Sequence, residues 1–123
     1  MVKKSILSEK SFAFAIRIVN LYKYQIEKNK EYIMSKQILR SGTSIGANIR
    51  EAYNAESKKD FIHKISIAQK ECDETIYWLE LLHKTNFLAE DLFSSIFTDA
   101  IELLKIIRST IITSKSRLIT NSS

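Results

Sequence analysis

The sequence contains no proline, only two glycines and a single cysteine in its 123 residues. Because proline and glycine break helices and shape tight turns, their scarcity favours a helical fold over a β-rich one. One cysteine excludes a disulfide within the chain. No apolar run approaches the roughly 20 residues that span a bilayer, and Met1 to Ser11 is polar and basic, without the apolar core of a secretory signal. We therefore expect a cytoplasmic protein without membrane contact.

What is present fits a folded domain. Hydrophobic residues make up 45% of the chain and charged residues 27%, which is the balance of a globular protein rather than of a disordered one. A chain of this length can bury its own core. We expect one domain over residues 1–123.

The chain is organised around the stretch Gln37 to Tyr53, where two helical patterns run side by side. Apolar and small residues recur at steps of four and three and predict a buried face, at Ile38, Gly42, Ile45, Ile49 and Ala52. Polar residues repeat the same steps one position earlier, at Gln37, Ser41, Ser44, Asn48 and Glu51.

These two patterns lead to two expectations. Gly42 and Gly46 each cost about 1 kcal/mol relative to alanine inside a helix, so they require a packing reason, which we take to be the close approach of another helix. We interpret Ser44, Asn48 and Glu51 as a hydrogen-bonded network at a helix contact, within or between subunits, with a binding surface as the alternative.

Hydrophobic periodicity predicts four helices, at about 3–28, 33–53, 57–84 and 90–112. Ser57 followed by Asp60 resembles a helix-capping box, and Asn86 suits a left-handed helix stop. The Ser/Thr-rich tail 113–123 is expected to fray. Long helices with short connectors predict an all-α, antiparallel up-down-up-down four-helix bundle.

The first and fourth helices carry more apolar residues than one core face needs. In the first helix we assign the core to Phe12, Ala15, Val19, Tyr22 and Ile26. The apolar residues left over in the first and fourth helices are Phe14, Ile18, Phe93, Phe97, Ile101, Leu104, Ile106 and Ile111. The third helix is assigned Phe61, Ile65, Ala68, Cys72, Thr75, Leu79 and Leu82, and the fourth Leu92, Ile96, Ala100, Leu103 and Ile107. The surplus predicts a symmetric oligomer, with a wide core stripe as the alternative.

Antiparallel folding also separates charge. One end gathers twelve basic residues against four acidic ones, Glu9, Glu51, Glu56 and Asp60; the basic residues are Lys3, Lys4, Lys10, Arg17, Arg50, Lys58, Lys59, Lys64, Lys105, Arg108, Lys115 and Arg117. The other end, which includes Asp99 and Glu102, is net acidic. A basic end attracts phosphate backbones, although a merely solvated surface is the alternative. The predicted nucleic-acid-binding residues are Arg50, Lys58, Lys59, Lys64, Lys115 and Arg117.

Residues able to carry catalysis are few. Cys72 lies on the core face of the third helix and reads as a small buried hydrophobe. His63 and His83 are twenty residues apart on one helix, about 30 Å by helical rise, and cannot share a metal. Glu71 and Glu74 lack the histidine spacing of a di-iron bundle. We expect no enzyme, no cofactor and no metal.

Several segments resemble one known family. They are Leu39-Arg40-Ser41, the run Ser44 to Glu51 (SIGANIRE), Asp60-Phe61-Ile62, Ile67-Ala68 and the run Glu74 to Leu79 (ETIYWL). The chain is similar to the four-helix bundle proteins encoded in intervening sequences of bacterial 23S ribosomal RNA. Family members often have Ala-Glu-Gly where this chain has Arg50-Glu51-Ala52, which lets the second helix run further here.

The resemblance implies a homopentameric ring. It also implies a relation to accessory proteins of diversity-generating retroelements, which bind nucleic acid and a reverse transcriptase through basic surfaces. Two functions follow as hypotheses. One is a non-enzymatic oligomer that binds RNA or DNA backbones through its basic end. The alternative is a structural or adaptor oligomer that recruits a protein partner and does not bind nucleic acid.

Overall fold

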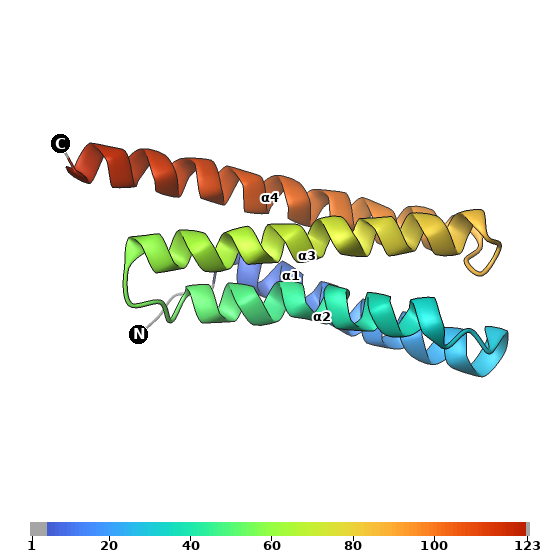
Figure 1. Ribbon diagram of the computed structural model, residues 1–123. Helices are drawn as coiled ribbons and strands as arrows, with labels where there is room; N and C mark the ends of the chain where they lie inside the picture. Colours follow the sequence, from blue (N-terminus) through green and yellow to red (C-terminus); the bar gives the residue numbers. More distant parts are fainter. Residues whose placement is uncertain (1–4, 123) are drawn as a thin grey trace.

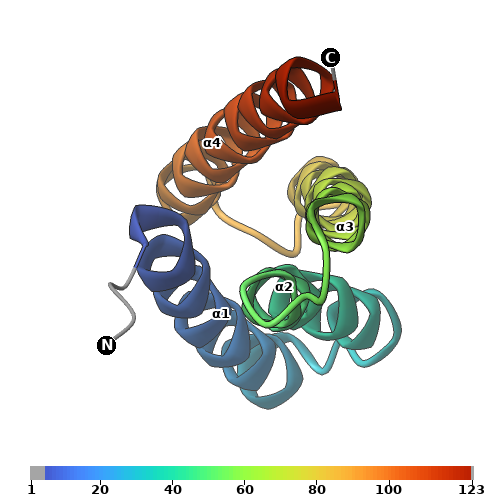
Figure 2. The same ribbon diagram turned by 90° about the vertical axis from the view of Figure 1, so that its left-hand side faces the viewer.

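The computed structural model describes residues 5–122, with side chains as far as Leu118. Its elements are α1 (Ile6–Tyr24), the π-helical turn η1 (Gln25–Asn29), α2 (Ile33–Ala52), α3 (Lys58–Lys84) and α4 (Glu90–Ser122). Successive helices run antiparallel (Figure 1) and surround a single core when viewed from one end (Figure 2). The predicted up-down-up-down four-helix bundle is confirmed.

Local capping explains the starts of α1 and α3 and the end of α3. The side chains of Ser5 and Ser57 accept hydrogen bonds from the backbone N–H groups of Ser8 and Asp60, so α1 and α3 each begin with an N-cap serine. At the other end of α3, Asn86 has φ of 68°, which is the left-handed conformation that stops a helix. The cap at Ser57 and the stop at Asn86 both agree with the sequence prediction.

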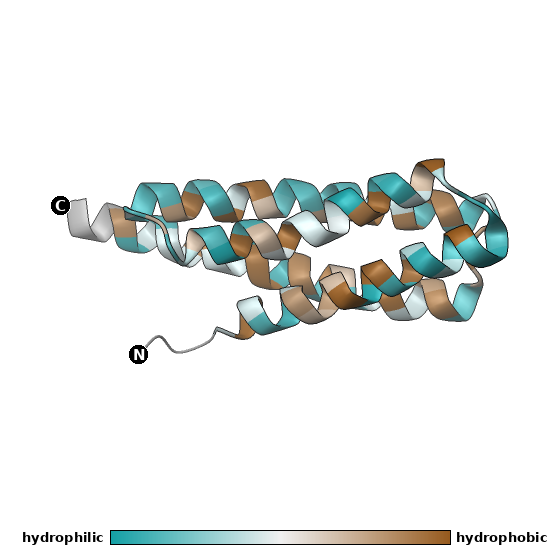
Figure 3. Cartoon of the chain, turned by 90° about the horizontal axis from the view of Figure 1, so that it is seen from below, coloured by the Kyte–Doolittle hydropathy of each residue, from teal (hydrophilic) through white to brown (hydrophobic). Residues whose placement is uncertain are grey.

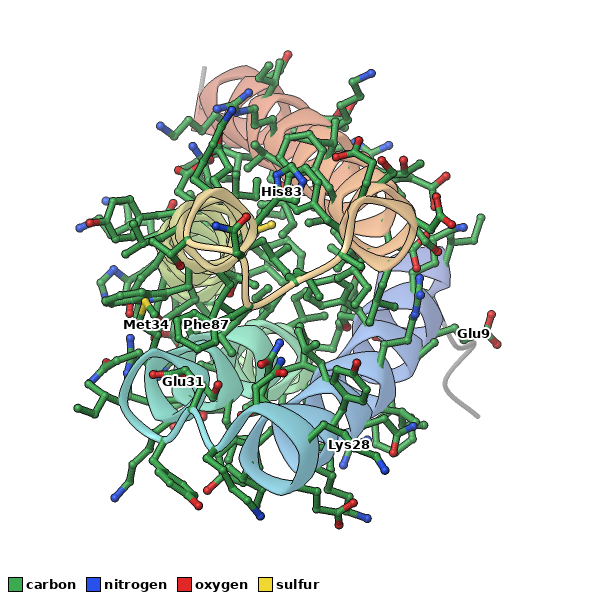
Figure 4. The ribbon with its side chains drawn as sticks, turned by 90° about the vertical axis from the view of Figure 1, so that its right-hand side faces the viewer. Glu9, Lys28, Glu31, Met34, His83 and Phe87 are labelled. Atoms are coloured by element: carbon green, nitrogen blue, oxygen red, sulfur yellow. The ribbon has the colours of Figure 1, made fainter. Side chains whose placement is uncertain are left out.

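The end of α1 has a feature that periodicity does not predict. Its last turn widens into η1, whose Gln25 side chain is fully buried. The Nε2 of Gln25 and the Nδ2 of Asn29 both donate to the Phe87 carbonyl, each over 2.8 Å. These bonds tie the α1–α2 connection to the α3–α4 connection and close this end of the bundle (Figure 4).

The core faces of the last three helices agree with the predictions almost throughout. The predicted core face of α2 is entirely buried, whereas Phe61 and Leu92 are only half-buried at the starts of α3 and α4. Leu104 and Ile111, which the prediction left over as surplus, are buried in the core, so the core face of α4 is wider than predicted. Core packing of this kind stabilises each amphipathic helix far more than its intrinsic propensity does.

The predicted core face of α1 is wrong. The buried residues of α1 and η1 are Leu7, Ser11, Phe14, Ile18, Leu21 and Gln25. The predicted seam lies to one side of this face, and its first member, Phe12, is 57% exposed. Two members of the buried face, Ser11 and Gln25, are polar. The apolar residues alone therefore indicated a stripe that is rotated to one side of the buried face. Apolar residues of α1 therefore remain exposed, at Ile6, Phe12 and Ile16. Figure 3 colours the chain by hydropathy and shows hydrophobic positions along the helices.

The two glycines of α2 do allow a close helix approach. A β-carbon at Gly42 would lie 2.8 Å from Cγ1 and Cγ2 of Ile18, and one at Gly46 would lie 3.3 Å from the Ser11 carbonyl oxygen. Both contacts are with α1. The missing side chains thus let α1 and α2 pack closely.

The predicted end of the fourth helix at 112, with a frayed tail, is also wrong, because α4 continues to Ser122. No glycine or proline interrupts this segment, and serine and threonine cost less than about 0.7 kcal/mol each in a helix. Ile111 is buried in the core and anchors the extension. None of the described helices has an apolar stretch long enough to cross a membrane.

Candidate nucleic-acid interface

The predicted basic residues lie at the end of the bundle where α2 turns into α3 and beyond which α4 projects (Figure 1). Arg50, Lys58, Lys59, Lys115 and Arg117 are exposed. Among the described residues, none of these five forms an ion pair. Lys3 and Lys4, which the sequence also assigns to this end, lie outside the described residues.

Lys64 differs from the other five. Its Nζ lies 2.9 Å from Oε1 of Glu51, and its side chain is only 29% exposed. The hydrogen bond to Glu51, and then the charge of Glu51, raise the pKa of Lys64. This cation already has an anionic partner, so it is the weakest of the predicted phosphate ligands.

The predicted polar network does not form within one chain. Ser44 Oγ donates to the Arg40 carbonyl at 2.6 Å, and Asn48 Nδ2 donates to the Ser44 carbonyl at 2.8 Å, so both bond to their own helix. The Glu51 side chain is 58% exposed. Over the ten residues from Ser41 to Glu51 a helix turns about 80° short of full turns, which carries Glu51 toward solvent. Burial between subunits stays a prediction.

The buried polar contact of α2 involves Ser41 instead. Its Oγ lies 2.9 Å from Thr75 Oγ1 on α3, so the two hydroxyl groups share a hydrogen bond, and both residues are fully buried. Ser41 belongs to the predicted polar stripe, but only this member faces α3 closely enough to be partnered there.

The predicted separation of charge is weaker in the structure. Lys10 Nζ lies 2.7 Å from Glu102 Oε1, and Arg17 Nη1 lies 2.7 Å from Asp99 Oδ2, although the sequence assigns these partners to opposite ends. The error follows from assigning every charge to one of the two ends, because Arg17 lies near the middle of α1 and Asp99 and Glu102 lie in the first half of α4, within reach of α1. The cations at the basic end without an ion pair among the described residues are Arg50, Lys58, Lys59, Lys105, Arg108, Lys115 and Arg117. From here on, the name basic end refers to these seven cations.

Two grooves open at the basic end. The first lies between α1 and α2 and is mostly apolar; its lining includes Ser8, Phe12, Ala15, Gly46, Ala47 and Arg50. The Arg50 guanidinium lies 5.8 Å from the centroid of the Phe12 ring, a cation–π distance. An arginine thus marks the rim of an apolar groove.

The second groove lies between α4 and the α2–α3 turn. Its lining includes Tyr53, Phe61, Lys105, Ser109, Thr110 and Arg117. Tyr53 lines the first groove as well and is 44% exposed. Its ring meets the Phe61 ring edge to face, with centroids 5.3 Å apart. The second groove therefore combines cations, hydroxyl groups and an open aromatic ring.

Tyr53 and Lys105 were not among the residues predicted to bind. The available signal for Tyr53 is its place between Arg50 and Lys58, since aromatic residues interleaved with basic ones are typical of nucleic-acid surfaces. Its exposure could not be predicted, because it depends on how α4 packs beside the α2–α3 turn.

Two further side chains considered for chemistry, Cys72 and His83, are held within the fold. Cys72 is buried, and burial raises the pKa of its thiol to about 12, which makes it a poor nucleophile. His83 pairs with Glu90 at 2.6 Å and stacks on Phe93 with ring centroids 4.1 Å apart. Nowhere in the described part of the chain do three His, Cys, Asp or Glu residues gather as a metal site.

The fold and this surface define a small four-helix bundle with an exposed basic end. The chain belongs to the family of 23S rRNA-intervening sequence proteins, whose pattern matches residues 3–109. It is similar to a crystal structure of a protein of unknown function from the S23 ribosomal protein family of Bacteroides thetaiotaomicron VPI-5482. The two are 55% identical, with a TM-score of 0.85 over 86% of this chain and 98% of the other. No curated protein matches the chain.

Proposed function

We propose that this protein is a non-enzymatic cytoplasmic oligomer that binds the phosphate backbone of RNA or DNA through its basic end. The observation that carries the proposal is the gathering, at one end of the bundle, of exposed cations from α2, α3 and α4 that form no ion pair among the described residues. Such a surface interacts with a polyanion largely without regard to sequence.

The start of α3 adds to this field. Its first backbone N–H groups and the positive end of its dipole point out of the bundle beside Lys58 and Lys59. Glu56 and Asp60 stand close to them in sequence and offset part of the potential. Weak, sequence-tolerant binding is the expected result for one subunit.

Oligomerisation would multiply this weak contact. Phe12 and Ile16 leave an apolar strip on the outer side of α1 at 57% and 50% exposure, which supports a contact between copies. A ring of five, as the family resemblance implies, would repeat the basic end around one rim. The accessory proteins of diversity-generating retroelements bind nucleic acid through basic surfaces, so a relation to them would support nucleic-acid binding by this rim.

A salt titration tests the proposal. Fluorescence anisotropy of labelled RNA and DNA should give an affinity that falls about tenfold or more between 50 and 200 mM salt, the loss expected for two or three phosphate contacts. Absence of binding at low salt would remove the proposed function.

The second candidate function is the adaptor. The apolar groove between α1 and α2 favours it, because Phe12 and Ala47 are exposed there beside Arg50. A protein partner seated in this groove would bind with little dependence on salt. The salt titration therefore separates the two functions.

A further inference from the structure

The groove between α4 and the α2–α3 turn carries more than phosphate binding requires. Cations alone neutralise a backbone, yet this groove also presents the Tyr53 ring and a row of hydroxyl groups on α4. The hydroxyl groups belong to Ser109, Thr110, Thr113 and Ser114 and lie along the helix between Lys105 and Arg117.

The Tyr53 ring contacts a neighbouring ring and is also partly exposed to solvent. Phe61 contacts it edge to face at a centroid distance of 5.3 Å, while 44% of the residue remains exposed. A ring fixed by one neighbour and open to solvent suits a stacking platform for a base. Bases inside a duplex already stack on their neighbours, so an unpaired base fits this ring best.

Thr110 supplies a second constraint. Its Oγ1 donates its hydrogen to the Ile106 carbonyl at 2.8 Å, which leaves the oxygen able only to accept. A phosphate offers only acceptors and gains nothing from such a group. A ribose 2′-hydroxyl can donate to it, whereas deoxyribose has no such donor.

The spacing of the cations suits a strand rather than a single ion. Lys105 and Arg117 are twelve residues apart on α4, about 18 Å by helical rise. Stacked nucleotides rise about 3.4 Å each, so several fit between the two cations. Tyr53 lies across the groove from this row of α4 residues.

We propose that this groove binds single-stranded RNA, with one base stacked on Tyr53, phosphates on Lys105 and Arg117, and a 2′-hydroxyl donating to Thr110. The inference rests on the proposed function, because these cations belong to the basic end. It adds that the ligand is single-stranded and that its sugar is ribose.

The test compares three labelled probes by fluorescence anisotropy at one salt concentration. They are a short unstructured RNA, the DNA of the same sequence, and the RNA annealed to its complement. Wild-type protein should bind the single-stranded RNA most tightly. Tyr53→Ala should weaken that binding about 5- to 150-fold, the range for one lost base stack, and leave duplex binding unchanged.

Four further variants complete the test. Tyr53→Phe keeps the ring and should bind as wild type does. Tyr24→Ala removes a tyrosine of similar exposure, 46%, near the opposite end and should change nothing. Thr110→Val should weaken RNA binding and leave single-stranded DNA binding unchanged. If Tyr53→Ala lowers the melting temperature, Tyr53→Leu keeps apolar bulk against Phe61 without a stacking ring and replaces it.

The outcomes separate the two proposals. Equal binding of all three probes, or an equal effect of Tyr53→Ala on single strand and duplex, overturns the inference while salt-dependent binding still supports the proposed function. Single-stranded DNA that binds as tightly as the RNA also overturns it. If no probe binds at low salt, both proposals fall.

Discussion

The Gly42 backbone packs directly against the Ile18 side chain, so that a β-carbon on Gly42 would lie 2.8 Å from two carbons of Ile18. Gly42→Ala must therefore displace a branched, fully buried side chain. Overpacking of this kind costs about 1–3 kcal/mol, which outweighs the gain of about 1 kcal/mol in helix propensity. We expect a net loss in the free energy of unfolding, measured by urea denaturation.

Gly46→Ala is the matched comparison. Its added carbon would lie 3.3 Å from the Ser11 carbonyl oxygen, a less severe contact. The loss should be smaller than for Gly42→Ala. A Gly42→Ala protein more stable than wild type would contradict the packing described here.

Glu31 caps α2 with its carboxylate. It accepts hydrogen bonds from the backbone N–H groups of Ile33 (3.2 Å), Met34 (3.1 Å) and Ser35 (2.7 Å), and from the Ser35 hydroxyl (2.6 Å). Burial opposes the charge, but the hydrogen bonds prevail and hold the pKa of Glu31 below its usual range.

This cap predicts a loss of stability in acid. Around these acidic pH values the folded protein binds fewer protons at Glu31 than the unfolded chain does. The contribution of Glu31 to the free energy of unfolding is therefore complete above the unfolded pKa of about 4.3 and is lost as the pH falls below that value. Glu31→Ala should cost about 1–3 kcal/mol at neutral pH and flatten the acid limb of a stability-versus-pH curve. Glu27→Ala, at an exposed position of η1, is the control.

The buried hydroxyl pair of Ser41 and Thr75 should matter more than the exposed pair of Glu51 and Lys64. Thr75→Val removes the hydrogen-bonding partner of Ser41 inside the core and should cost about 1–2 kcal/mol in the free energy of unfolding. Glu51→Ala should leave the melting temperature of one subunit nearly unchanged, because the pair is solvated. A large loss from Glu51→Ala would indicate that this carboxylate is buried between subunits.

The apolar strip on α1 predicts an assembly. Sedimentation equilibrium at micromolar concentration should give five times the chain mass, as expected for a ring. Phe12→Glu with Ile16→Glu should lower that mass without lowering helix content, because both residues are exposed in the single chain. A wild-type mass equal to one chain would contradict the ring.

The parts of the fold that could be predicted are those where periodicity is long and regular. The seams of α2 and α3 contain few polar interruptions, so their buried faces follow from spacing alone. The face of α1 could not be found this way, because Ser11 and Gln25 occupy buried positions and satisfy their hydrogen bonds locally or to the Phe87 carbonyl. Polar residues with buried partners are invisible to a hydropathy pattern.

The basic end could be predicted in part, because antiparallel connectivity alone places Arg50, Lys58 and Lys115 at one end. Which charges pair could not be predicted. The contacts of Lys10 with Glu102 and of Lys64 with Glu51 depend on how far each helix is shifted and rotated against its neighbour. Part of the groove beside Tyr53, lined by Thr113, Ser114 and Arg117, likewise depends on the continuation of α4 past residue 112.

The most direct test of the basic end reverses charge there and, separately, at the other end. Lys58→Glu with Lys59→Glu is compared with Lys28→Glu with Lys36→Glu, which changes the net charge equally at exposed positions far from the α2–α3 turn. Binding of labelled RNA is measured by anisotropy at low salt, with mass and melting temperature checked for each variant. We expect the first pair to weaken binding at least tenfold and the second to leave it within about twofold of wild type. Equal binding by both variants and the parent, or equal weakening by both pairs, would contradict a binding surface at the basic end.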